Sequence, residues 1–532
     1  CDDAETLKLS DDAMNFLSES LKIRKVLLGE DDIIVKDTFQ SVGIAHLNRA
    51  LALKNDVNKM DSERGKAFKA LTSALELRRS FSRTNDGSKL PNEYSDSILM
   101  EAHCLFYLGC VEESRSKYEG AKSHYIDALR LFQAEGKQRL SKMSPQPNEK
   151  SAVDSEEKLL IELEAINLWA ARTLYHMANI HKFTGANEDA VSCYEEALRL
   201  RNQCKSTKKH GLQNALIHLD LAKVLHENQN YDKSIECYSF SLRTYLAHFG
   251  KDSLDVADTL ISMGKSFAMK SIFDKTMQCY DKAMRVYEYR ESSSLKEKKG
   301  LLHREIADTV RRLDGDIVEC LEHYRSAVSF LEEFNERHRS AAVASDKSDQ
   351  ELNKQLLQYY SEMLAILRQV LSIERDSNVK VELCDEISDV LHRMGNLHAT
   401  FGEYDEAMDC FTDVLETLRK ANTDELRIAD LLFNMGNIYL EQGLPEKSLD
   451  CLRESYDITS EALGEDSAEL HSTLYLLGVA LINSEDYESA LKWLTQALSV
   501  LKSNEDENGV HESPRGKTLY KMGTVYQKLG DQ

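Results

Sequence analysis

Apolar residues recur along this chain at the three- and four-residue steps of an amphipathic α-helix. In residues 474–498, Gly478 is followed 12, 16 and 19 positions later by Ala490, Leu494 and Ala497. Apolar residues at such steps form one face of a helix that can be buried. The pattern therefore predicts two antiparallel helices, one around the glycine and one carrying the alanines, with a turn near Asp486.

The same frame of small and large residues recurs through most of the sequence. Its first small residue stands at Gly109, Ala178, Ala222, Gly264, Gly395, Gly436 and Gly478. A small residue in the first helix allows the second helix to approach closely, and the large residue 16 positions later fills the space beside it. One helix pair cannot bury its apolar face alone, so a run of such pairs predicts a stacked array.

These residues match the signature of the tetratricopeptide repeat, a helix–turn–helix unit. The resemblance covers nearly the whole chain. It implies an all-α fold, an α-solenoid in which antiparallel helix pairs form a right-handed superhelix. The family also implies that first helices line a concave groove that binds an extended or helical peptide.

The repeats are long, and a short phrase recurs between them. Successive first residues lie 41 to 45 positions apart, for example from Ala178 to Ala222, compared with the usual 34. The phrase LGxD stands in residues 27–32 and 462–474, and the related FGKD stands in residues 248–260. Long repeats joined by this phrase resemble those of kinesin light chain and related cargo-binding proteins.

Charge and composition narrow the classes of partner and compartment. The net charge is −23, which disfavours nucleic acid as a partner. No apolar stretch is long enough for a membrane span, so no membrane insertion is expected. The eleven cysteines form no CxxC pair and favour a reducing, cytoplasmic location without a metal site. Oligomeric state is not determined by these features.

Five cysteines share one position in the frame, 15 residues after the small residue. This offset predicts thiols buried beside the core. They are Cys193, Cys237, Cys279, Cys410 and Cys451.

Polar stretches and decay of the frame divide the chain into five parts. Residues 1–134 hold N-terminal repeats that begin within a repeat, and 135–164 is a polar linker. Central repeats occupy 165–334, a degenerate repeat is expected over 335–377 with a bend near 335–352, and C-terminal repeats fill 378–532. Because the pattern begins and ends within a repeat, the sequence is expected to be part of a longer protein.

The candidate ligand-binding residues lie two positions before or one after the small residues, and at 100° per residue they point away from the core. Asparagine can bond both edges of a peptide backbone, and cations select acidic groups. The predicted peptide-groove residues are His176, Asn179, Lys223, Lys265, Arg393, Asn396, Asn434, Asn437 and Lys521.

No catalytic residue and no cofactor are predicted. Gly264-Lys265-Ser266 and Gly516-Lys517-Thr518 resemble the end of a phosphate-binding loop but lack its first glycine. The sequence thus favours a non-catalytic scaffold or cargo adaptor that binds a protein or peptide. Two alternatives remain: a regulatory region of a larger protein with a catalytic domain elsewhere, and a co-chaperone that clamps a C-terminal carboxylate.

Overall fold

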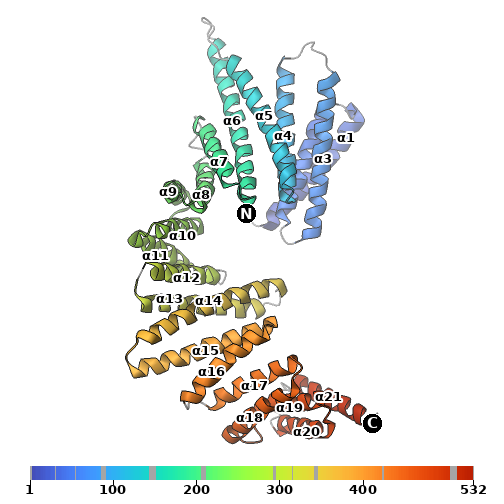
Figure 1. Ribbon diagram of the computed structural model, residues 1–532. Coiled ribbons are helices and arrows are strands. Elements are labelled where there is room, and N and C mark those ends of the chain that lie inside the picture. The colour runs from blue at the N-terminus through green and yellow to red at the C-terminus, as the bar shows by residue number, and fades with distance from the viewer. Residues whose placement is uncertain are drawn as a thin grey trace. The chain divides into compact units, whose positions relative to one another are not determined.

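The computed structural model describes most of the chain as helices (Figure 1). The described residues are 3–29, 32–53, 56–84, 91–142, 151–204, 211–290, 295–313, 315–340, 346–421, 425–503 and 512–530. These ranges contain 21 helices and no strand. The predicted all-α solenoid of antiparallel helix pairs is confirmed. Within this described part, no helix is both long and apolar enough to cross a membrane.

The chain divides into two compact units, residues 1–289 and 290–532. In the first unit, α1 packs on α2, and the following helices form five pairs, α2–α3 to α10–α11. The helices of this unit are α1 (Asp3–Leu28), α2 (Ile33–Ala52), α3 (Val57–Thr84), α4 (Pro91–Ser114), α5 (Tyr118–Lys142), α6 (Ser151–Phe183), α7 (Asn187–Asn202), α8 (Gly211–Glu227), α9 (Tyr231–Phe249), α10 (Leu254–Met269) and α11 (Phe273–Tyr289).

The second unit contains four pairs, α12–α13, α15–α16, α17–α18 and α19–α20, together with the single helices α14 and α21. Its helices are α12 (Lys296–Arg312), α13 (Ile317–Ser340), α14 (Asp346–Ile373), α15 (Ser377–Phe401), α16 (Tyr404–Ala421), α17 (Glu425–Glu441), α18 (Pro445–Leu463), α19 (Leu470–Asn483), α20 (Tyr487–Ser503) and α21 (Glu512–Gly530). The boundary between the two units lies at residue 289.

The glycines of the frame lie where two helices of a pair approach most closely. A Cβ atom added at Gly264 would lie 2.5 Å from a ring carbon of Tyr280, and one at Gly478 would lie 2.6 Å from Leu494. In both pairs the opposing residue stands 16 positions after the glycine. The spacing that defines the predicted frame therefore corresponds to a direct contact between helices.

Buried hydroxyl groups join the two helices of several pairs. Twelve positions after the small residue, Ser234 donates to the carbonyl oxygen of Ala222 at 2.8 Å, and Ser448 donates to that of Gly436 at 2.7 Å. Each serine occupies a position that is alanine in other repeats. A small residue at this position can thus either pack or bond to the facing helix.

One pair departs from the frame by a single residue. The Cys320 thiol donates to the carbonyl oxygen of Ala307 at 3.3 Å, the same kind of bond at an offset of 13. Ala307 is therefore the small residue of the α12–α13 pair, and the link between its helices carries one extra residue. The pair lies within the predicted central repeats, with its frame shifted by one position.

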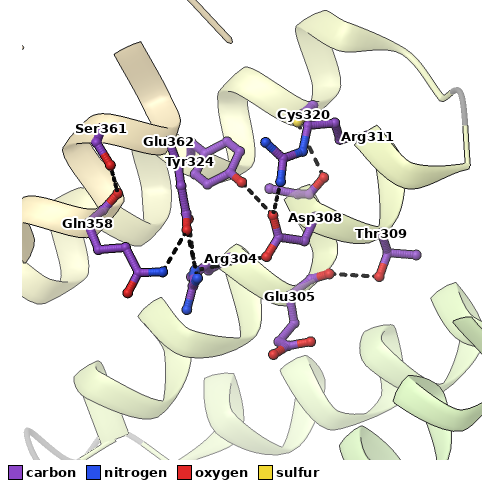
Figure 2. Close-up of polar contacts among 11 residues, drawn as sticks. Arg304, Glu305, Asp308, Thr309, Arg311, Cys320, Tyr324, Gln358, Ser361 and Glu362 are labelled. Carbon is purple, nitrogen blue, oxygen red and sulfur yellow. Dashed lines mark hydrogen bonds and ion pairs between the residues drawn. The ribbon is translucent and has the colours of Figure 1, made fainter. Parts of the chain in front are cut away.

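Helix α14 has no partner helix of its own. The 335–377 segment, where the sequence predicts a degenerate repeat, contains the end of α13, the 28-residue α14 and the start of α15. Arg304 of α12 forms a two-pronged ion pair with Glu362 of α14, with distances of 2.9 and 2.7 Å (Figure 2). Arg368 of α14 contacts Asp413 of α16 at 3.3 Å. Side chains therefore connect α12, α14 and α16 as neighbours in one layer.

The neighbouring layer is built from α13, α15 and α17. Arg325 of α13 forms a two-pronged ion pair with Glu386 of α15, at 2.7 and 2.6 Å. Arg427 of α17 contacts Asp389 of α15. Before α14, the layer of α12 holds first helices and the layer of α13 holds second helices. After α14 the order is reversed, because the first helix α15 lies beside α13 and the second helix α16 lies in the layer of α12. The insertion of the single helix α14 causes this reversal.

Two further expectations need correction. Much of the predicted 135–164 linker is helical, because α5 continues to Lys142 and α6 begins at Ser151. The prolines of this linker lie outside the described residues.

Of the five in-frame cysteines, only Cys279 is fully buried. Each of these cysteines directly precedes the large core residue of its repeat, and one position along a helix rotates the side chain by 100°, away from the core. Partial burial nevertheless raises the pKa of Cys237 and Cys451 to about 11.

Candidate functional site

One hollow of unit 1 lies between the first helices α6 and α8. It has a volume of about 390 Å³. Helix α6 supplies residues at 168, 169, 172, 175 and 176, a spacing that places them on one helical face. The lining residues are Leu168, Trp169, Arg172, Tyr175, His176, Arg201, Gln213, Leu216 and Ile217.

Two arginines give this hollow its charge. The exposed guanidinium of Arg172 lies 5.3 Å from the ring centre of Trp169 and 5.1 Å from that of Phe106, within cation–π range. Arg201, from the end of α7, is only 5% exposed and donates to the amide oxygen of Gln213 at 2.8 Å. No carboxylate belongs to the described residues that line the hollow, although the chain as a whole is strongly acidic.

Carboxylates just outside the hollow hold two lining side chains in place. His176 Nδ1 lies 2.9 Å from Glu113 Oε2, and the Tyr175 hydroxyl donates to Asp220 at 2.8 Å. Burial, reinforced by Asp220, raises the pKa of Tyr175 above its ordinary value, so this phenol stays neutral. The result is a preformed wall of aromatic rings with cationic groups beside it.

Among the described residues of unit 2, two smaller hollows lie on the layer of α13, α15, α17, α19 and α21. The first, of about 280 Å³, lies across α17, α19 and α21 and is lined by Phe433, Asn437, Tyr475 and Lys517, among others. The second, of about 290 Å³, lies between α13, α14 and α15. Arg393 and Asn396 of the predicted groove line this second hollow.

The nine predicted groove residues do not all face a hollow. His176, Arg393, Asn396 and Asn437 do. The others have different surroundings in the structure: Asn179 accepts from the Tyr194 hydroxyl at 2.6 Å, Lys223 lies 3.5 Å from Asp220, Asn434 bonds to His392 at 3.2 Å, and Lys265 and Lys521 are half-buried on α10 and α21.

Sequence reasoning missed Trp169, Arg172 and Arg201. The first two lie seven and four positions before His176 on the same face of α6, so extending the helical period from His176 would have found them. Arg201 had no such signal, because it reaches the hollow from the end of a second helix. Only the packing of α7 against α8 brings it there.

The comparisons with known proteins agree with this architecture. Tetratricopeptide-repeat family models match residues 171–204, 390–426 and 427–503. These matches fall on the α6–α7, α15–α16 and α17–α20 pairs. The chain therefore contains tetratricopeptide repeats, helix pairs that stack on their neighbours in an array.

Several solved structures are similar in fold. BtubC (BKLC) from P. vanneervenii is 12% identical, with 54% of this chain and 93% of that chain covered and a TM-score of 0.29. YrrB, described as a TPR protein with an unusual peptide-binding site, is 14% identical, with 51% and 91% covered and a TM-score of 0.28. RapI in its apo form is 13% identical, with 60% and 99% covered and a TM-score of 0.33. No curated protein matches the sequence.

Proposed function

We propose that this protein is a non-catalytic protein-interaction scaffold, and that the hollow between α6 and α8 binds an acidic peptide segment through an apolar anchor. The observation that carries the proposal is the lining of that hollow. Two arginines and aromatic rings meet there, with no carboxylate among the lining residues that the structure describes, in a chain of net charge −23. Such a site attracts a carboxylate and an adjacent aliphatic or aromatic side chain.

The surface is also suited to binding because its parts are held before a ligand arrives. Trp169 packs 4.4 Å from His103 and 5.5 Å from Phe106, measured between ring centres. Arg201 is fixed by the amides of Gln213 and Asn214. A preformed site loses less conformational entropy on binding than a flexible one.

The test selects peptides from a random display library with the full chain and with two variants. Arg172→Glu reverses a charge in the hollow. Arg243→Glu makes the same change at an exposed position on α9, outside it. We expect the wild type and Arg243→Glu to enrich peptides with an acidic residue beside an apolar one. Arg172→Glu should weaken these peptides about tenfold or more, which corresponds to about 1.4 kcal/mol.

Raising the salt concentration should also weaken binding, because part of the attraction is between exposed charges. Enriched peptides without acidic residues, or equal binding to Arg172→Glu, would refute the proposed site.

The long repeats and the LGxD phrases support a more specific role, that of a cytoplasmic cargo adaptor similar to kinesin light chain. A regulatory role for a catalytic domain elsewhere in the polypeptide uses the same surface and remains the alternative. The carboxylate clamp has less support. Asn434 bonds to His392, and Ser472 and Leu476 stand where that clamp needs cations.

A further inference from the structure

The hollow between α13, α14 and α15 has the opposite chemistry to the one in unit 1. Glu332, Asn335 and Glu336 line it from α13. Because they stand three and four positions apart, they share one face of that helix. Leu356 of α14 and Leu397 of α15 provide apolar walls. Acceptors and apolar surface therefore dominate this site.

The cation at its edge is already engaged. Arg393 forms an ion pair with Glu332, which also accepts from the Tyr360 hydroxyl. Burial lowers the pKa of Arg393, but the hydrogen bond with Tyr360 and the charge of Glu332 outweigh this effect and raise the pKa above its ordinary value. Arg393 therefore stabilises the packing of α15 against α13. The sequence instead predicts that Arg393 would bind an acidic side chain of a ligand.

Asn335 is the residue that points to a ligand. It is 4% exposed, and its Nδ2 donates to Asn353 Oδ1 at 2.9 Å. Its own Oδ1 is buried and has no hydrogen-bond partner among the described residues. A buried acceptor left without a donor costs about 1–3 kcal/mol. A group that donates a hydrogen bond into the hollow would recover this free energy.

We propose that this hollow binds a lysine side chain of a partner peptide. The methylene groups pack against Leu356 and Leu397, as lysine stems do on apolar surface. The ammonium group donates to Asn335 Oδ1 and lies beside the exposed Glu336 carboxylate. The ammonium is a compact charge with three donors, which suits separate acceptors on one helix face.

This site is separate from the hollow proposed above and selects the opposite charge. The scaffold then carries one surface for acidic segments in unit 1 and one for a basic side chain in unit 2. A partner with both features could occupy either site, so the test removes one site at a time.

The experiment selects random displayed peptides with the full chain carrying Arg172→Glu, which disables the unit 1 hollow. We expect enrichment of peptides with a lysine next to an apolar residue. Replacing that lysine by norleucine should abolish binding. Glu336→Gln should weaken the selected peptides about tenfold, whereas Glu319→Gln, an equal charge change at an exposed position earlier on α13, should not.

A change at Asn335 separates recognition from folding. Asn335→Leu removes the buried acceptor, so it should abolish the binding of lysine peptides while circular dichroism shows unchanged helix content. The proposal is wrong if no basic peptides are enriched, if arginine alone is selected, or if Asn335→Leu binds them as the wild type does. Loss of acidic peptides in the unit 1 test would leave this result unaffected.

Discussion

At the residue scale, the fold depends on where a Cβ atom can and cannot be placed. Gly478 of α19 and Gly523 of α21 occupy the same position of the frame. A Cβ at Gly478 would lie 2.6 Å from Leu494, whereas one at Gly523 would meet no described atom within 4 Å. The same residue type therefore has a packing role at one position and none at the other.

This difference predicts opposite effects of the same substitution. Gly478→Ala should lower the free energy of unfolding by about 1–3 kcal/mol, because the core around Leu494 must shift. Gly523→Ala should raise it by about 0.5–1 kcal/mol, because alanine favours an exposed helix interior. The urea midpoint of each variant measures this. Equal midpoints for the two variants would show that the frame does not mark close contacts.

A second residue-scale prediction concerns pH. His103 of α4 lies between Phe132 and Trp169, and burial, aided by Arg78, lowers its pKa from 6.5 to about 4. The unfolded chain binds a proton at this residue near pH 6.5, and the folded chain does so only near pH 4. Stability from His103 is therefore present above about pH 6.5 and lost as the pH falls toward 4.

His103→Phe should flatten the pH dependence of unfolding between pH 6.5 and 4. It should also be tolerated at pH 7, because His103 Nε2 is buried without a hydrogen-bond partner in the described structure. Urea unfolding of both proteins across this pH range tests the idea. An unchanged slope would mean that other groups produce the acid sensitivity.

At the element scale, the unpaired α14 depends on side chains that connect it to α12. The half-buried Arg304–Glu362 pair has good two-pronged geometry (Figure 2). Arg304 also lies 4.8 Å from the ring centre of Tyr359. The hydrogen bond with Glu362 raises the pKa of Arg304, so this group stays charged at any ordinary pH. The pair joins α14 to α12 across the exchange of layers.

Arg304→Met should therefore reduce hydrogen-exchange protection in α14 and lower stability by about 1.5–3 kcal/mol, the range for hydrogen bonds to charged groups. Arg311→Met is the control, because it removes an exposed ion pair with Asp308 that stays within α12. A double-mutant cycle with Glu362→Gln isolates the pair. A coupling energy near zero would show that the Arg304–Glu362 pair does not stabilise α14.

At the scale of the whole molecule, a solenoid transmits changes mainly to neighbouring repeats. Gly478→Ala should thus lower hydrogen-exchange protection in α17–α20 while leaving α2–α5 unchanged. A uniform loss of protection along the chain would instead show that the array unfolds as one cooperative unit.

The pattern of small and large residues was sufficient for the helix pairs. A glycine and a large residue 16 positions later must meet if two helices of this length pack antiparallel, so local spacing determines the contact. In the α12–α13 pair, which falls within the predicted central repeats, one extra residue in the link shifts the frame by one position from Ala307.

The binding surfaces were only partly predictable for a different reason. His176 and Asn437 line hollows because they follow helical periodicity, which the sequence contains. Arg201 enters one hollow from a second helix, and Arg393 is engaged by Glu332, 61 residues away. The sequence by itself determined that this protein is an array of helix pairs. Tertiary packing decided which polar groups bind each other and which face a ligand, because that depends on neighbours distant in the chain.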